Sequence, residues 1–151
     1  MQINQTREEK AVELFSSGYN CAQSVFGAFC EDNGLDLDTA LKIACGFGGG
    51  GMRYKSTCGA VSGGMMVIGL KIGQHVNGDV ETKKYCYKKI HEFTAKFKEK
   101  NGSIKCNELL GVGKDVEKAM EKDPAKVKSL FTSVCVEFVK SAVQILENME
   151  F

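Results

Sequence analysis

One cysteine of this chain stands between a glycine-rich stretch and a run of apolar residues. The cysteine is Cys58, the glycines lie in 46–51, and the apolar run is 65–70. If a helix begins at Cys58, unpaired backbone N–H groups and the positive end of the helix dipole favour its thiolate form. Thiolates attack disulfides and bind metals, so the pattern predicts sulfur chemistry. We therefore expect Cys58 to be the most thiolate-like cysteine.

Three further cysteines, Cys21, Cys106 and Cys135, also stand at the expected starts of helical segments. Helix starts can gather at one end of an antiparallel bundle, so we expect at least three of the four sulfur atoms in one pocket. The leading interpretation is redox catalysis by this cluster, with Cys58 as the attacking thiolate. Cys106 or Cys135 is then its resolving partner, and the protein is an oxidoreductase.

The same four cysteines allow two other interpretations. Four thiolates are the usual ligands of an iron–sulfur cluster, or with less support of zinc, so Cys21, Cys58, Cys106 and Cys135 could form a metal-binding or electron-transfer module. The third interpretation is a non-catalytic helical adaptor whose cysteines merely pack, because buried cysteine is common in protein cores. The sequence alone leaves all three open.

The composition predicts a cytoplasmic protein. The chain has 151 residues, 43% of them hydrophobic and 26% charged, with a net charge of +1. This charge gives no reason to expect nucleic acid binding, and the longest weakly charged run, 58–70, is too short to insert across a membrane. In the cytoplasm seven cysteines favour metal or redox chemistry over structural disulfides. We expect a redox partner and leave open whether the protein forms a homo-oligomer.

Apolar residues recur at helical spacing in at least five segments, and strand-like alternation is scarce. The fold class that this predicts is all-α, a single-domain bundle of five to seven helices over residues 1–151. The first expected segments run from Thr6 to Gly18, from Ala22 to Asn33, from Thr39 (capped by Asp38) to Cys45, and from Thr57 to an end around Gly73 to Gly78. The others run from Val80 to Lys100, briefly after Cys106, and from Pro124 to the C-terminus with a break near Thr132.

Glycines stand inside the expected fourth helix, at Gly59, Gly63, Gly64 and Gly69. Each costs roughly 1 kcal/mol relative to alanine, which favours close helix packing over the alternative of room for a ligand beside Cys58. The run 46–51 is expected to form a bend. Arg53 and Lys55, which follow it, would add to thiolate stabilisation if the loop brings them near.

At these residues the chain resembles the C_GCAxxG_C_C family of small redox-active proteins. The central motif is a Cys-Gly-Ala-x-x-Gly sequence, here 58–63, with one cysteine before it and two after it. Cys21, Cys106 and Cys135 match these three, and the resemblance covers nearly the whole chain. It implies redox activity of the four cysteines but names no substrate. Cys30, Cys45 and Cys86 fall outside the pattern, and we assign them to packing.

Overall fold

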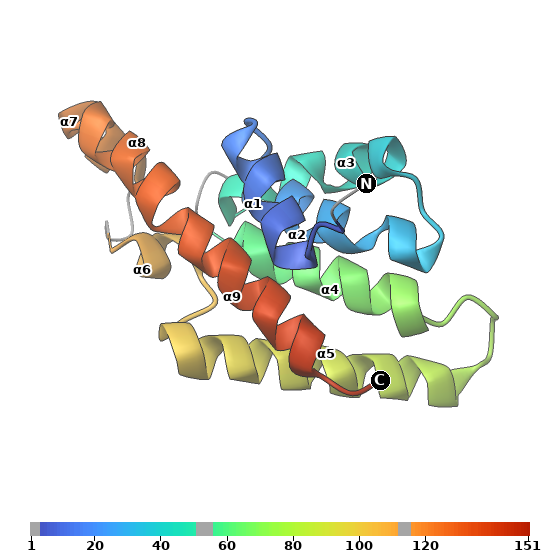
Figure 1. The fold of residues 1–151 in the computed structure, drawn as a ribbon. Helices are drawn as coiled ribbons and strands as arrows, with labels where there is room; N and C mark the ends of the chain where they lie inside the picture. Colours follow the sequence, from blue (N-terminus) through green and yellow to red (C-terminus); the bar gives the residue numbers. More distant parts are fainter. Residues whose placement is uncertain (1–3, 51–55, 112–115) are drawn as a thin grey trace.

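Helices make up nearly all the regular structure of the part of the chain that is described. The computed structural model describes residues 4–50, 56–111 and 116–151 (Figure 1). Its elements are α1 (Arg7–Ser16), α2 (Cys21–Phe29), the 3-10 turn η1 (Glu31–Asn33), α3 (Leu37–Ala44), the 3-10 segment η2 (Cys45–Gly50), α4 (Gly59–Ile72), α5 (Val80–Asn101), α6 (Cys106–Leu110), α7 (Val116–Lys122), α8 (Pro124–Ser133) and α9 (Cys135–Asn148). The all-α class is confirmed. The helices exceed the expected five to seven, because α7 was not anticipated and α8 and α9 are separate helices.

α4 is the central helix of the fold. It packs against α2, α5 and α9. In Figure 1 it runs antiparallel to α5, and α9 crosses diagonally in front of it. Its apolar residues Val61, Val67 and Ile68 are fully buried, and so are Phe93 and Phe97 of α5. Burying large side chains of this kind stabilises the fold by roughly 1.5–3 kcal/mol each. Other helices cover most sides of α4, which explains why nearly all of its residues are apolar.

Two glycines allow neighbouring elements to approach α4 closely. A Cβ atom on Gly63 would lie 2.7 Å from the backbone oxygen of Ala22 in α2, and one on Gly64 would lie 2.2 Å from the ring of Phe93. The close-packing explanation therefore holds at these positions. Gly69 differs, because a Cβ atom there would meet no atom within 4 Å.

Side-chain caps begin several helices, including α1 and α3, with one correction to the prediction. Thr6 caps α1 as expected, accepting a hydrogen bond from the backbone N–H of Glu9. α3 is capped by Asp36, which accepts from the N–H of Thr39 at 2.9 Å, and not by Asp38. The earlier start places Leu37 on the same face as the buried residues of α3, so side-chain packing selects between the two aspartates.

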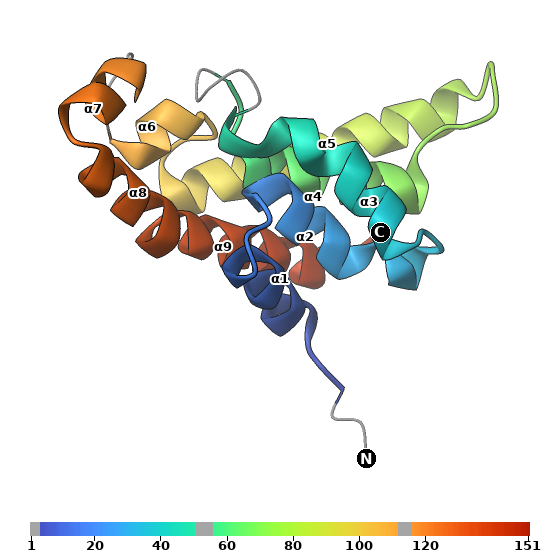
Figure 2. The same cartoon turned by 90° about the horizontal axis from the view of Figure 1, so that it is seen from above.

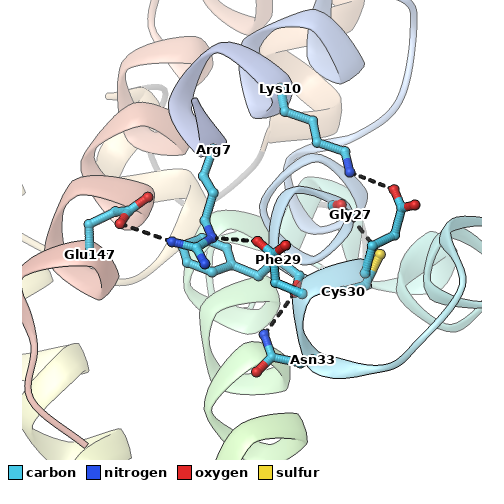
Figure 3. Close-up of polar contacts among 9 residues, drawn as sticks. Arg7, Lys10, Gly27, Phe29, Cys30, Asn33 and Glu147 are labelled. Carbon is cyan, nitrogen blue, oxygen red and sulfur yellow. Dashed lines mark hydrogen bonds and ion pairs between the residues drawn. The ribbon is translucent and has the colours of Figure 1, made fainter. Parts of the chain in front are cut away.

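A polar cluster centred on Arg7 joins α1, α2 and α9 (Figure 3). The Arg7 guanidinium donates to Asp32 at 3.0 Å and to Glu147 at 3.1 Å, and it lies 5.0 Å from the centre of the Phe29 ring. Phe29 ends α2 and Glu147 lies near the end of α9. The cluster therefore holds together the ends of α2 and α9 that are opposite to Cys21 and Cys135.

One helical run among the described residues, Pro124–Asn148, is long and apolar enough to cross a membrane by length and composition. In the structure 44% of its most apolar window is buried against the rest of the protein. Core helices of soluble proteins pass the same test, so this run is weak evidence of membrane insertion.

Candidate functional site

Four helix starts meet at a pocket of about 370 Å³. Cys21, Cys106 and Cys135 are the first residues of α2, α6 and α9, and Cys58 is the residue before α4. All four cysteines line this pocket. The predicted convergence is therefore confirmed, and so is the placement of each cysteine at a helix start; their catalytic roles remain predictions.

A short antiparallel bridge places Cys58 beside Cys106. The backbone N–H of Cys58 donates to the oxygen of Ile104 at 2.7 Å, and that of Cys106 donates to the oxygen of Ser56 at 3.0 Å. These two bonds flank the pair Thr57 and Lys105, so Cys58 and Cys106 occupy diagonal positions on one side of the bridge. Segments almost 50 positions apart in the sequence are held in register in this way.

Cys21 is positioned by a capping box at the start of α2. Asn20 accepts from the backbone N–H of Gln23 at 2.9 Å, and Gln23 accepts from that of Asn20 at 3.0 Å. The Asn20 side chain also donates to the backbone oxygen of Cys45 at 2.9 Å, which attaches η2 to the site. A Cβ atom on Gly59 would lie 3.1 Å from that of Cys21, so glycine at this position lets α4 start directly beside Cys21.

Cys135 lies at the junction of α8 and α9, one residue after Val134. It forms a small buried cluster with Cys106 and Leu110 of α6, against which Cys21 packs. Figures 1 and 2 both show α6 beside this junction. The helix break predicted near Thr132 is present at Val134. Because of this break, α9 begins at Cys135, which lines the pocket.

Cys21 and Cys135 share a hydrogen bond. The Cys21 thiol donates to the Cys135 sulfur, and this bond is the first cause of a lowered pKa at Cys135. The same bond, with burial and the neighbouring sulfur atoms, raises the pKa of Cys21 well above its ordinary value. A donated hydrogen bond stabilises the charged form of its acceptor. When the pair loses one proton, the remaining proton therefore stays on Cys21 and the charge lies on Cys135.

The prediction that Cys58 is the most thiolate-like cysteine is wrong. The backbone N–H groups of Ala60 and Val61 do favour the thiolate, as expected at a helix start, but Cys58 is only 4% exposed. Burial outweighs them and raises the pKa of Cys58 to about 11. Burial likewise raises the pKa of Cys106 to about 12. Arg53 and Lys55, expected to help, lie outside the described residues.

The arrangement of the described donor side chains, rather than their chemical type, does not fit a metal ion. Among residues 4–50, 56–111 and 116–151, no group of three or more histidine, cysteine or acidic side chains is arranged to hold one. Cys21, Cys58, Cys106 and Cys135 line one pocket without forming such a group. The geometry therefore gives no support to an iron–sulfur or zinc site, and we derive no step through a metal.

The other three cysteines divide between core and surface. Cys30 is fully buried and Cys86 is nearly so, as predicted from their apolar stripes. Cys45 is exposed, so the prediction that it packs is wrong. It begins η2, where α3 has ended, and so it no longer shares the buried face of that helix. All seven cysteines are free thiols.

Some residues of the site were not anticipated from the sequence. Asn20 was passed over, although the Asn-x-x-Gln spacing of a capping box was present in the sequence. Phe15, Phe131 and Phe138 also line the pocket. No local signal distinguishes them from ordinary core phenylalanines, because their role depends on how α1, α8 and α9 meet.

The sequence profile of the family described as "Putative redox-active protein (C_GCAxxG_C_C)" matches residues 19–149. The chain belongs to this family. The family name gives the order of the motif as Gly-Cys-Ala. In this chain the order is Cys58-Gly59-Ala60, so the glycine follows the cysteine. The matched range contains all four pocket cysteines. No curated protein and no solved structure matches the chain closely enough to add a relative.

The hydrogen bond between Cys21 and Cys135 predicts the pH dependence of alkylation. Only thiolate reacts, so the rate at Cys135 should reach half its maximum below the ordinary thiol value of 9.0, and that at Cys58 near 11. Cys21→Ala removes the donor and should shift the Cys135 midpoint upward, whereas Cys21→Ser retains a hydroxyl donor and should shift it less. Mass spectrometry of alkylated peptides over a pH series measures both midpoints. An unchanged Cys135 midpoint in Cys21→Ala would contradict the bond.

Proposed function

We propose that this protein is a thiol–disulfide oxidoreductase whose reacting pair is Cys21 and Cys135. The observation that carries the proposal is the packing of these two cysteines together at the wall of a pocket, where a hydrogen bond from Cys21 lowers the pKa of Cys135. The residues are far apart in the sequence, and an internal disulfide requires a fold that brings its two cysteines together, as this one does. Family membership supports redox activity in general and leaves the particular chemistry as our proposal.

Cys135 is the attacking group in this proposal. Its thiolate attacks one sulfur of a substrate disulfide, so that a bond forms to the Cys135 Sγ and the substrate S–S bond breaks. The leaving thiolate takes the proton that Cys21 held. One half of the substrate leaves as a free thiol, and the other half remains bonded to Cys135 as a mixed disulfide.

Cys21 is the resolving group. Once Cys135 is in a mixed disulfide, the charge that disfavoured ionisation of Cys21 is gone, so its thiolate forms more readily. It attacks the Cys135 Sγ, closes the Cys21–Cys135 disulfide and releases the second half of the substrate. The protein has lost two electrons and the substrate has gained two. A dithiol reductant or a reduced partner protein restores the pair.

Cys58 and Cys106 remain protonated near neutral pH and serve as part of the pocket wall in this proposal. The adaptor alternative is less favoured, because packing alone does not require four cysteines from four helices to meet at one pocket. Seven free thiols also favour a reducing compartment, and we propose the cytoplasm.

Limited oxidation of the reduced protein tests which cysteines form the pair. One molar equivalent of a diazenedicarboxamide oxidant should produce a disulfide between Cys21 and Cys135 ahead of any other, identified by peptide mapping under acid-quenched conditions. Cys45, which is exposed and far along the chain from either partner, is the internal control for unselective oxidation. A first disulfide joining Cys58 to Cys106, or joining two chains through Cys45, would refute the assigned pair.

A further inference from the structure

The described residues that line the pocket around the cysteines are all uncharged side chains or thiols. Its apolar walls include Phe15, Leu109, Phe131 and Phe138. Asn20 and Thr132 are among its few polar side chains, and no described residue that lines it is acidic, basic or a histidine. Among the described lining residues, charge therefore arises when the Cys21–Cys135 pair loses a proton.

We infer that the substrate is a small, neutral, apolar disulfide. This inference rests on the proposed function and adds the chemical class of the substrate. The pocket volume of about 370 Å³ admits a compact molecule, and several aromatic side chains are available to contact apolar groups flanking the S–S bond.

Charged disulfides are disfavoured by the same walls. A carboxylate brought among Phe15, Phe131 and Phe138 loses water and gains no cationic partner from the described lining. An anionic substrate is also repelled by the Cys135 thiolate, because two negative charges approach each other in a region of reduced dielectric. Charged thiol metabolites and acidic peptides are therefore poor fits for this pocket.

The chemistry balances for such a substrate. Its S–S bond accepts two electrons and becomes two neutral thiols, while Cys21 and Cys135 lose two electrons and become a disulfide. One proton comes from Cys21 and the other from solvent. A dithiol reduces the Cys21–Cys135 disulfide before the next turnover. A single-turnover experiment does not require this reductant.

Two chromogenic aromatic disulfides provide the test, neutral dithiodipyridine and dianionic dithiobis(nitrobenzoic acid). Each is mixed with the reduced protein in a stopped-flow instrument, and each rate is divided by that of the same disulfide with a small free thiol, which removes intrinsic reactivity. After this correction the neutral reagent should react with the pair at least about tenfold faster than the dianion. Peptide mapping of quenched samples confirms that Cys21 and Cys135 were oxidised.

A matched pair of variants tests whether the pocket causes the preference. Thr132 is exposed in α8 and lines the pocket, whereas its neighbour Ser133 is exposed and does not line it. Both side chains donate to the backbone oxygen of Ser129. Thr132→Lys should reduce the neutral-to-anionic rate ratio about five- to tenfold, and Ser133→Lys should change it little. The ratio is used because a lysine that lowers the pKa of Cys135 would accelerate both reagents together.

The outcomes separate the substrate class from the proposed function. Equal corrected rates with both reagents, with Cys21 and Cys135 oxidised, would overturn the neutral apolar class and leave the oxidoreductase intact. Equal ratios in Thr132→Lys and Ser133→Lys would also overturn the role of the pocket. If neither reagent oxidised the pair while Cys45 reacted, the proposed function itself would fail.

Discussion

Replacing Cys135 by serine is expected to reduce thiol–disulfide turnover by roughly a thousandfold or more, to the uncatalysed rate, because a neutral hydroxyl replaces the attacking thiolate. The assay follows dithiodipyridine reduction with a dithiol as the terminal reductant. Cys135 is the acceptor of the Cys21 hydrogen bond and the pocket cysteine with a lowered pKa, so no other described thiol is equally prepared to attack. Cys58 and Cys106 are held as protonated thiols by burial.

Cys21→Ser should fail at a different step. Cys135 can still attack, but its mixed disulfide has no resolving thiol, so one substrate half should remain on the protein. Intact-mass spectrometry would detect the added half at Cys135 after a single turnover. Cys45→Ser, at an exposed position that does not line the pocket, is the control and should retain full turnover. If Cys58→Ser abolished turnover while Cys135→Ser did not, the assignment of the attacking group would have to return to Cys58.

Gly63→Ala is expected to lower the free energy of unfolding by about 1–3 kcal/mol, because the added methyl group is forced against backbone. Its Cβ atom would lie 2.7 Å from the oxygen and 3.1 Å from the Cα of Ala22, and 3.1 Å from the Cβ of Val25. Backbone atoms of a packed helix move only if α2 and α4 separate. Denaturant unfolding followed by circular dichroism measures the loss.

Gly69→Ala is the matched control, since it makes the same chemical change in the same helix. A Cβ atom there meets nothing within 4 Å, and alanine favours a helix over glycine by about 0.5–1 kcal/mol. This variant should therefore be slightly more stable than the original protein. Opposite signs at the two positions are the expected signature of close approach between α2 and α4. Equal effects would show that the contact at Gly63 does not constrain the fold.

The helical fold was predictable because the relevant signals are local. Apolar residues at helical spacing, Thr6 as a cap and Pro124 at a helix start each act within a few neighbouring residues, and the structure contains the helices that they indicate. The four cysteines at helix starts were predictable for the same reason. Capping can still be ambiguous, as at Asp36 and Asp38, where both residues are competent caps and only packing of the helix face distinguishes them.

The sequence by itself determined that this protein is helical, that four cysteines begin helices, and that glycines allow α4 to pack closely. Tertiary structure decided which cysteine carries the charge, because burial and partners come from segments distant in sequence. Cys58 has the more favourable local surroundings for a thiolate, but the fold covers it and raises its pKa. Cys135 has an unremarkable local sequence, but the fold places the Cys21 thiol against it as a hydrogen-bond donor.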